Sequence, residues 1–464
     1  MADLLPPPER LFVANRGEIA LRIIRAAHAL GIETVLGVST ADRDSLAARE
    51  AGRTVVLGPP PSRESYLNRN LVVHAAVGTG CTALHPGYGF LSERPELAEL
   101  CAQEHIVFVG PTADAIRSVG DKLSAKRLAE SAGVPMTRGS GKITDVQHAL
   151  RVAESIGYPV ITKASAGGGG RGMIVAHNPG ELADAFNRAA ATAREAFGDD
   201  TLYIERYVER ARHLEVQVMG DGTGRIVHFG ERDCSLQRRY QKMIEEAPAS
   251  ILPEDVRVRL RAAAVDLLGS INYRNAGTVE FLYDEHRQEF SFMEVNARIQ
   301  VEHPVSEQIT RIDLIKMQLE VATQQCALPA QSTIEVRGHA IEARILAEDP
   351  ANNFSPCPGR ITHWRAPTGA GVRVDSGFGE GSMVPPFYDS MIAKLIVYGR
   401  NRDEAVERLI RALSNFEVQG IATNLPLLIA IATHDDFRSN DISTRWLEST
   451  LLPSFASRGS ASSP

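Results

Sequence analysis

Residues 160–176 read VITKASAGGGGRGMIVA, which contains the longest run of consecutive glycines in the chain. Two short apolar runs, Val160–Lys163 and Met173–Ala176, flank a loop with four successive glycines at 167–170. Because a strand and not a helix follows the glycines, the stretch differs from a dinucleotide-binding fingerprint. Ordering four glycines costs too much backbone entropy for an ordinary turn, whereas their bare amides can approach phosphates closely. The stretch therefore predicts a phosphate-binding flap, with Lys163 beside it.

The region before this flap has the rhythm of a parallel sheet. Short apolar runs alternate with helical stretches, the runs being Leu11–Ala14, Thr34–Val38, Thr54–Leu57 and Ile106–Val109, and the helices Glu18–Leu30 and Tyr66–Val77. Such βαβ alternation is typical of a doubly wound parallel sheet, which we expect over residues 1–120. The turn after the first run lacks the glycines of a dinucleotide site, which argues against a dehydrogenase.

The region after the flap changes to paired strands. We expect Leu202–Tyr207 to pair with Leu214–Met219, and Thr278–Tyr283 with Phe290–Val295. The predicted fold class is thus α/β and α+β: the N-terminal parallel sheet, a central domain at 121–334 whose mobile lid covers about 135–208, and a C-terminal mixed β domain at 335–450. The serine-rich end, 451–464, is predicted to be a disordered tail.

Composition excludes several classes of protein. Hydrophobic residues make up 44% of the 464 residues and charged residues 23%, which is ordinary for a globular protein. A net charge of −7 gives no sign of a nucleic-acid-binding surface, and no apolar run reaches the length of about 18 residues that a membrane span needs. The five cysteines are scattered without metal-binding or disulfide spacing. We therefore expect a cytoplasmic protein that binds neither nucleic acid nor membrane.

Lysine is rare in this chain. Arginine supplies most of the 50 basic residues, and the seven lysines are Lys122, Lys126, Lys142, Lys163, Lys242, Lys316 and Lys394. A lysine in such a chain can place a compact point charge where the planar fork of arginine does not fit, for example against a phosphate. Chance is the alternative explanation for any single one of them.

The segment 294–302, EVNARIQVE, alternates strictly between polar and apolar residues. In an extended chain one side would carry Glu294, Asn296, Arg298, Gln300 and Glu302. The pattern alone also fits an edge strand with a solvated face. A hairpin centred near Arg287 would, however, place Glu280 opposite Glu294, and opposed carboxylates destabilise a sheet unless a cation lies between them. Together with the glycine flap, this pair indicates a site for ATP with Mg²⁺. Arg298 could then clamp a small oxyanion, and Glu302 could act as a base.

Eight segments together resemble one enzyme family. They are VANRGEIA at 13–20, HPGYGFLSE at 85–93, GDK at 120–122, the glycine loop, GERDCS at 230–235, EVNARIQVEHPVSE at 294–307, and, in the third domain, HAIEAR at 339–344 with PPFYDSMIAKLI at 385–396. Over nearly the whole chain the sequence is similar to the biotin carboxylase family of the ATP-grasp fold. The central domain at 121–334 is then the ATP-grasp domain.

The resemblance implies that the chain carboxylates biotin with bicarbonate and ATP, through carboxyphosphate. Bicarbonate would be surrounded by Lys242, Arg298, the backbone of Gln300 and Val301, and Glu302, which would deprotonate it. Arg298 would steady carboxyphosphate, and Arg344 would stabilise the enolate of biotin. Two Mg²⁺ ions, with Mn²⁺ as an alternative, would lie on Glu280, Glu294 and Asn296. ATP would be held by Lys122, Lys163, Gly169, Gly170, Glu205, Arg206, Tyr207, Val208, His213, Gln237 and Tyr240.

The resemblance also implies partners. No Met-Lys-Met biotin attachment sequence occurs in the chain. A biotin carboxyl carrier protein and a carboxyltransferase subunit would therefore be separate proteins, as in an acyl-CoA carboxylase, and the carboxylase would be a homodimer. The acceptor that is finally carboxylated, such as acetyl-CoA, propionyl-CoA, pyruvate or urea, is not indicated by this sequence.

Two positions depart from the family pattern. Tyr240 stands where a histidine or asparagine is usual, and Ala166 replaces a glycine at the start of the loop. Because tyrosine carries no positive charge at neutral pH, we expect somewhat weaker binding of ATP and intact chemistry. The alternatives are another ATP-grasp carboxylate ligase, which would not need Arg298, Glu302 and Arg344 together, and a catalytically impaired nucleotide-binding subunit.

Overall fold

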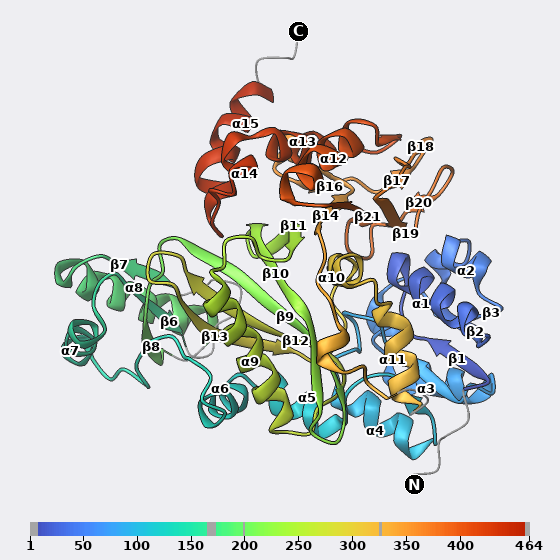
Figure 1. The fold of residues 1–464 in the computed structure, drawn as a ribbon, viewed down its shortest axis with the longest axis horizontal. Helices are drawn as coiled ribbons and strands as arrows, with labels where there is room; N and C mark the ends of the chain where they lie inside the picture. Colours follow the sequence, from blue (N-terminus) through green and yellow to red (C-terminus); the bar gives the residue numbers. More distant parts are fainter. Residues whose placement is uncertain (1–7, 165–172, 198–199, 324–326, 460–464) are drawn as a thin grey trace. The chain divides into compact units, whose positions relative to one another are not determined.

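The structure is a computed structural model that describes residues 8–164, 173–197, 200–323 and 327–459 (Figure 1). It divides into two compact units. The larger unit contains Met1–Val134, His213–Phe281 and Met293–Pro464, and the smaller unit contains Pro135–Arg212 and Leu282–Phe292. Ala166, Gly169 and Gly170, on which the sequence analysis relies, lie outside the described residues.

The N-terminal part of the larger unit is the expected parallel sheet. Its strands are β1 (Arg10–Val13), β2 (Glu33–Ser39), β3 (Arg53–Gly58), β4 (Ala83–His85) and β5 (Val107–Phe108), in the order β3-β2-β1-β4-β5. Every neighbouring pair is parallel. The helices are α1 (Gly17–Ala29), α2 (Leu46–Glu50), α3 (Arg69–Gly78), α4 (Pro95–Gln103), α5 (Ala113–Gly120) and α6 (Lys122–Ser131). In α1, Ile19, Ile23 and Ala27 recur every four residues and are buried, which explains how this helix packs on the sheet.

The rest of the larger unit is built on one sheet of eight strands. Its order is β13-β12-β9-β10-β11-β14-β21-β19. The bounds are β9 (Ala211–Asp221), β10 (Ile226–Arg238), β11 (Gln241–Ala247), β12 (Arg274–Asp284), β13 (Glu289–Asn296), β14 (His339–Leu346), β19 (Val372–Ser376) and β21 (Met391–Gly399). The pairings from β9 to β11, from β11 to β14, and from β14 through β21 to β19 are antiparallel. Strands of the central and C-terminal regions thus continue one another in a single sheet.

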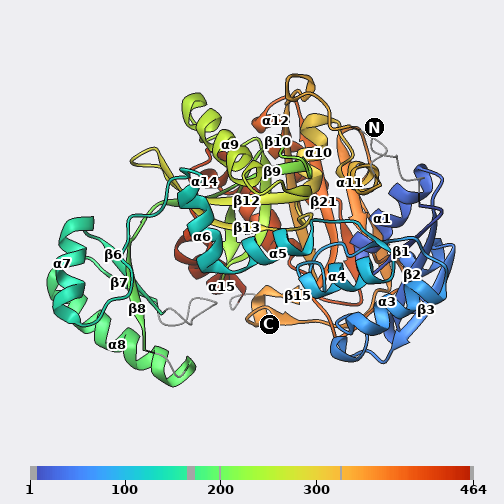
Figure 2. The same ribbon diagram turned by 90° about the horizontal axis from the view of Figure 1, so that it is seen from below.

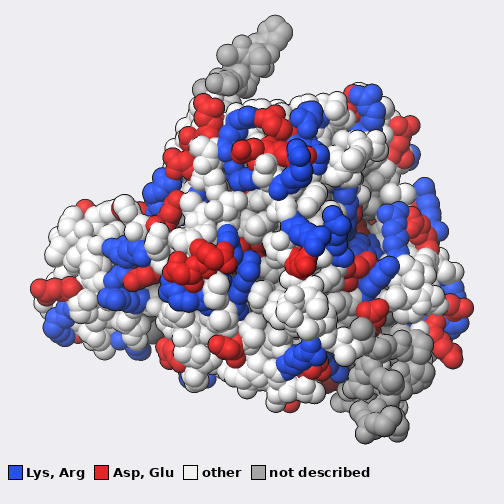
Figure 3. Space-filling model, in the orientation of Figure 1, with Lys and Arg blue, Asp and Glu red and all other residues white. Residues whose placement is uncertain are grey.

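Helices and small sheets complete this unit. The helices are α9 (Glu254–Gly269), α10 (His303–Thr310), α11 (Leu314–Ala322), α12 (Arg402–Ser414), α13 (Leu425–Thr433), α14 (Asp435–Arg438) and α15 (Leu452–Gly459). The short strand pairs are β15 (Glu348–Asp349) with β16 (Ser355–Pro356), β17 (Gly359–Arg360) with β20 (Met383–Val384), and β18 (His363–Arg365) with β22 (Glu417–Gln419). On the face drawn in Figure 3, acidic and basic side chains are interspersed. No helix within the described ranges is long and apolar enough to cross a membrane.

The smaller unit is a sheet of three strands covered by two helices. Strands β6 (Val160–Ala164), β7 (Ile174–Ala176) and β8 (Leu202–Arg206) form the antiparallel order β7-β6-β8. Helices α7 (Val146–Ile156) and α8 (Pro179–Phe197) lie on the same side of it (Figure 2). The predicted pairing of Val160–Lys163 with Met173–Ala176 is confirmed, because β6 and β7 are antiparallel neighbours.

Two predictions about local structure are wrong. Leu202–Tyr207 does not pair with the run after it: β8 pairs with β6, because Leu202 and Ile204 are buried in the core of the smaller unit, while β9 pairs with β10. The tail is not disordered from residue 451, because α15 continues the chain to Gly459. Leu452 and Phe455 pack against the C-terminal core, which explains the helix.

Candidate functional site

The polar centre of the larger unit is formed by Lys242, Glu302 and Arg344. Lys242 lies on β11 and Arg344 on β14, which are neighbouring antiparallel strands. Glu302 immediately precedes α10, which packs against β10, β11 and β14. The sheet and α10 therefore bring together three charged residues from distant parts of the sequence. Lys242 and Arg344 are 102 positions apart.

Lys242 contacts four other side chains of this centre. Its Nζ donates to Glu302 Oε1 at 2.6 Å, Glu215 Oε2 at 2.8 Å, Glu280 Oε1 at 3.1 Å and Gln300 Oε1 at 3.3 Å. Burial opposes the charge of this ammonium group, but the three carboxylates raise the pKa of Lys242 well above its ordinary value. Lys242 thus remains charged, and it is the cation that allows three buried carboxylates to lie together.

Glu302 is fully buried between two cations. Besides Lys242 on Oε1, Arg344 Nη2 donates to its Oε2 at 3.1 Å. Burial and Glu215 favour the neutral acid, but Lys242, Arg344 and Arg232 outweigh them and lower the pKa of Glu302. Glu302 is therefore ionised at neutral pH and able to accept a proton.

A second carboxylate orients Arg344. Arg344 Nε donates to Glu245 Oε1 at 2.6 Å, and Glu245 lies on β11. Burial raises the pKa of Glu245 to about 7, although Arg344 acts in the opposite direction. Arg344 is thus held on one side by Glu245 and on the other by Glu302.

Arg298 is oriented by three neighbours. Its Nε donates to Glu93 Oε2 at 3.0 Å, its Nη2 to Asn296 Oδ1 at 3.0 Å and its Nη1 to the Ile299 carbonyl at 3.2 Å. A guanidinium group has five N–H donors, so these bonds within the described part of the chain leave two donors for a ligand. Arg298 thus has both a fixed position and free capacity to bind an anion.

The three predicted metal ligands differ in their surroundings. Glu280 accepts from His213 Nε2 at 2.8 Å on one oxygen, and from Asn296 Nδ2 at 2.9 Å and Gln300 Nε2 at 3.0 Å on the other. Burial raises the pKa of Glu280, but Lys242 and His213 together bring it well below its ordinary value. Glu294 has no such donors among the described residues; desolvation and the charge of Glu280 raise its pKa.

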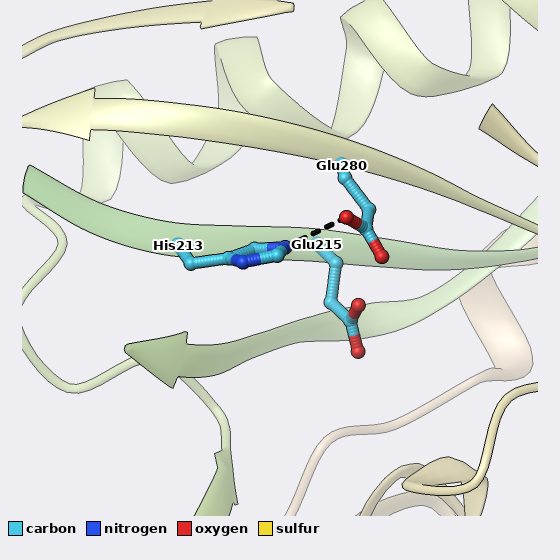
Figure 4. Close-up of side chains that lie close together, drawn as sticks. All are labelled: His213, Glu215 and Glu280. Carbon is cyan, nitrogen blue, oxygen red and sulfur yellow. Dashed lines mark hydrogen bonds and ion pairs between the residues drawn. The ribbon is translucent and has the colours of Figure 1, made fainter. Parts of the chain in front are cut away.

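This donor set fits a divalent cation. Two carboxylates and the Asn296 amide supply oxygen ligands, which Mg²⁺ prefers, and a cation would turn the repulsion between Glu280 and Glu294 into attraction. His213, Glu215 and Glu280 also gather their ligand atoms within 4.8 Å of one another (Figure 4). In that second group Glu215 already pairs with both Lys242 and Arg232, which makes it a poorer metal ligand.

The predicted ATP-binding residues are spread over both units. Lys122, at the start of α6, His213, Gln237 and Tyr240 belong to the larger unit. Lys163 and the run Glu205–Val208 belong to the smaller unit, where Lys163 Nζ donates to Glu205 Oε2 at 2.5 Å. Within that run the Arg206 guanidinium donates to the Ile156 carbonyl, and the Tyr207 amide to the Pro159 carbonyl.

Tyr240 lies at the tip of the hairpin from β10 to β11. It is 65% exposed, and both turn residues have positive φ, 46° at Arg239 and 67° at Tyr240. Two-residue hairpin loops favour this geometry, but asparagine and glycine adopt it at lower cost than tyrosine. Tyr240 is therefore largely exposed and its backbone conformation is that of the turn.

The predicted nine-residue strand is shorter than expected. β13 ends at Asn296, and α10 begins at His303 with Pro304 in its first turn. Four of the five polar side chains still converge, because the chain turns at 297–302: Arg298 bonds to Asn296, and Gln300 and Glu302 both contact Lys242.

Three residues of the centre were not predicted from the sequence: Glu93, Glu215 and Glu245. Glu93 lies in a segment that the analysis quoted, HPGYGFLSE, and it also accepts from the Ala297 amide. Glu215 and Glu245 lie on β9 and β11, where both faces are buried almost throughout. Such strands lose the polar–apolar alternation that would reveal a functional face.

Three family models match the chain in sequence order. The model of the biotin carboxylase N-terminal domain matches residues 7–116. The model of the carbamoyl-phosphate synthase L chain ATP-binding domain matches 121–329, and that of the biotin carboxylase C-terminal domain matches 342–449.

Several relatives match over almost their full length. The chain is 48% identical to biotin carboxylase 1 of Bacillus subtilis (strain 168), covering 95% of this chain and 98% of that protein. A structure of the biotin carboxylase–β,γ-ATP complex from Campylobacter jejuni is 43% identical, with a TM-score of 0.87 and coverage of 95% and 98%. The biotin carboxylase domain dimer of 2-oxoglutarate carboxylase from Hydrogenobacter thermophilus, solved with MgADP, ADP and bicarbonate, is 42% identical, with a TM-score of 0.86 and coverage of 96% and 98%.

Proposed function

Since this chain belongs to the biotin carboxylase family of ATP-dependent ligases, we propose that its polar centre carboxylates the biotin of a separate carrier protein, using bicarbonate and ATP. The observation that carries the assignment of residues is the contact of Glu302 with both Lys242 and Arg344. A base between two fixed cations suits a reaction in which an acid loses a proton and a second substrate gains negative charge.

The first step needs a base and a clamp for anions. Glu302, whose pKa is lowered by its cationic neighbours, takes the proton of bicarbonate, and Lys242 stabilises the additional negative charge that results. A bicarbonate oxygen then forms a bond to the γ-phosphorus, ADP leaves, and carboxyphosphate results. Arg298, with two donors still available, holds the carboxyphosphate.

The second step needs stabilisation of an enolate. Carboxyphosphate breaks down to CO₂ and phosphate, the phosphate takes the N1′ proton of biotin, and N1′ forms a bond to CO₂. Arg344 stabilises the negative charge on the ureido oxygen of biotin while Glu245 holds the guanidinium group in place. Preorganised charge of this type stabilises a transition state without rearrangement at the moment of reaction.

Glu280, Glu294 and Asn296 would hold Mg²⁺, two ions in all, with Mn²⁺ as an alternative. Bound there, the metal would supply positive charge to the phosphates of ATP. His213 and Lys242 keep Glu280 ionised and thus ready to act as a ligand. Lys122, Lys163, Gly169, Gly170, the run Glu205–Val208, Gln237 and Tyr240 are the residues that we assign to ATP.

The partners follow from the same assignment. A biotin carboxyl carrier protein would deliver biotin, and a separate carboxyltransferase subunit would choose the acceptor, as in an acyl-CoA carboxylase. A homodimer is supported by the dimeric structure from Hydrogenobacter thermophilus. The described cysteines are free thiols, which agrees with a reducing cytoplasm.

Release of phosphate from ATP tests this function. We expect the purified chain, given Mg²⁺, ATP and ¹⁴C-bicarbonate, to release phosphate faster when free biotin is added and to fix acid-labile ¹⁴C on biotin. Hydrolysis that responds to another carboxylate, and to neither bicarbonate nor biotin, would identify a different ATP-grasp ligase. Binding of ATP without any turnover would identify a catalytically impaired subunit.

A further inference from the structure

Lys394 is a buried lysine that the mechanism above does not use. It lies on β21, its side chain is fully buried, and it is one of only seven lysines in the chain. The sheet register places it directly beside Arg344 on β14 and beside Asp375 on β19. Directly paired residues share a face of the sheet, so Lys394 is on the same face as Arg344.

Lys394 contacts the backbone next to the proposed base. Its Nζ donates to the Val301 carbonyl at 2.8 Å and forms an ion pair with Glu18 Oε1 at 3.1 Å. Glu18, from α1, also accepts a hydrogen bond from the Tyr88 hydroxyl. The ammonium group is thus held by Glu18 on one side and holds the Val301 carbonyl on the other.

The Val301 carbonyl belongs to the peptide group that joins Val301 to Glu302. Because a peptide group is planar, a bond that fixes this carbonyl also fixes the amide of Glu302. No side chain caps the N-terminus of α10 at Glu302. Among the described residues, Lys242 holds the side chains of this turn at Gln300 and Glu302, whereas the bond from Lys394 is a charged contact to its backbone.

The surroundings of Lys394 explain why a charged group is stable there. Burial opposes its charge, but the carboxyl groups of Glu18, Glu342 and Asp375 raise the pKa of Lys394. Glu342 is fully buried and its two oxygens have no hydrogen-bond partner in the described structure; burial keeps its pKa well above the ordinary value.

We propose that Lys394 is a positioning residue that fixes the Gln300–Glu302 turn, and so sets the place where bicarbonate binds beside Glu302 and Arg344. This inference rests on the proposed function, because it assigns the turn to bicarbonate. A purely structural role, in which Lys394 only neutralises Glu18, is the alternative.

Substitutions at both ends of the ion pair separate the two roles. Lys394→Met removes both the ion pair and the bond to Val301. The double variant Lys394→Met/Glu18→Gln also removes the carboxylate that would otherwise be left unpaired and buried, so it protects the fold. Glu18→Gln alone retains Lys394 and its bond to Val301, and it serves as the matched control.

The measurement is the KM for bicarbonate and the KM for ATP in biotin-stimulated phosphate release, with melting temperatures recorded alongside. We expect the double variant to melt close to the control and to have a bicarbonate KM raised about tenfold or more, the size expected for one charged hydrogen bond. We expect its ATP KM, and both KM values of the control, to stay within about twofold of wild type.

Equal bicarbonate KM values in the double variant and the control would overturn the proposal. So would a parallel rise of both KM values in the double variant, which would indicate general damage. Wild-type protein that shows no bicarbonate-dependent phosphate release would instead refute the proposed function itself.

Discussion

Glu245 and Glu246 are neighbours on β11, yet they belong to two different buried networks. Alternation along the strand sends their side chains to opposite faces of the sheet. Glu245 accepts from Arg344, which also contacts Glu302. Glu246 accepts from His339 Nε2 at 2.7 Å and from Arg402 Nε at 2.8 Å.

The two networks end differently. Arg402 continues to the backbone carbonyls of Arg438 and Phe437, at 2.8 Å each, so its network ties α12 to the end of α14. Arg344 continues to Glu302, a side chain that can exchange a proton. Similar buried ion pairs thus lead to a helix end on one face and, on the other, to the residue that we propose as the base.

Glu302→Gln should have the largest effect on activity. The amide cannot accept the proton of bicarbonate, so we expect the rate of bicarbonate-dependent phosphate release to fall by about 10²–10⁴-fold. The melting temperature should change little by comparison. Lys242→Met is not a suitable control, since it would remove the ammonium group that three buried carboxylates share. A variant that kept more than a tenth of the wild-type rate would remove Glu302 from the role of base.

Glu246→Gln should have the largest effect on stability. Removing one partner from a buried ion network lowers the free energy of unfolding by about 3–5 kcal/mol. Here Arg402 would be left buried without its counter-charge. We expect denaturant unfolding to show this loss, while the rate per folded molecule stays close to wild type. A normal midpoint combined with a slow enzyme would reverse the assignment of the two faces.

The pH dependence of stability should have opposite signs for the two glutamates. Arg402 and His339 outweigh the effect of burial and lower the pKa of Glu246 to about 2, from an ordinary 4.5. Its stabilisation should be complete above pH 4.5 and be lost as the pH falls to about 2. Burial raises the pKa of Glu245 to about 7, so its contribution should be complete below pH 4.5 and be lost as the pH rises to about 7.

Thermal unfolding across this range, compared with Glu245→Gln and Glu246→Gln, measures both signs. Each variant should remove one pH dependence and leave the other. If both variants change the curve in the same direction, the two faces do not differ in the way described.

Tyr240→His should have the smallest effect. Tyr240 is exposed at a hairpin tip, so the substitution should leave folding unchanged, and a positive charge there should lower the KM for ATP by a few-fold at most. Steady-state kinetics at fixed bicarbonate measure it. A higher KM for ATP would mean that tyrosine is the better ligand in this chain.

The sequence predicted those parts of the site that alternate or form a quoted motif. Glu294 to Glu302 could be recognised because polar and apolar residues alternate there, although β13 ends at Asn296. Glu215 and Glu245 could not, since strands buried on both faces show no alternation. The pairing of β8 was missed because its apolar residues fit either sheet, and only the core of the smaller unit selects one.

The most direct test of the account compares Arg344→Ala with Arg402→Ala. The two side chains are 13% and 11% exposed, and each is bound to a buried glutamate, so the substitutions are matched in burial and charge. The measurement is the stimulation of phosphate release by free biotin, per folded molecule. Because each substitution leaves a buried carboxylate without its arginine, both should lower the melting temperature. We predict that Arg344→Ala abolishes the stimulation, while Arg402→Ala retains it. Stimulation that survives in Arg344→Ala, or that is lost in a folded Arg402→Ala, would contradict the account.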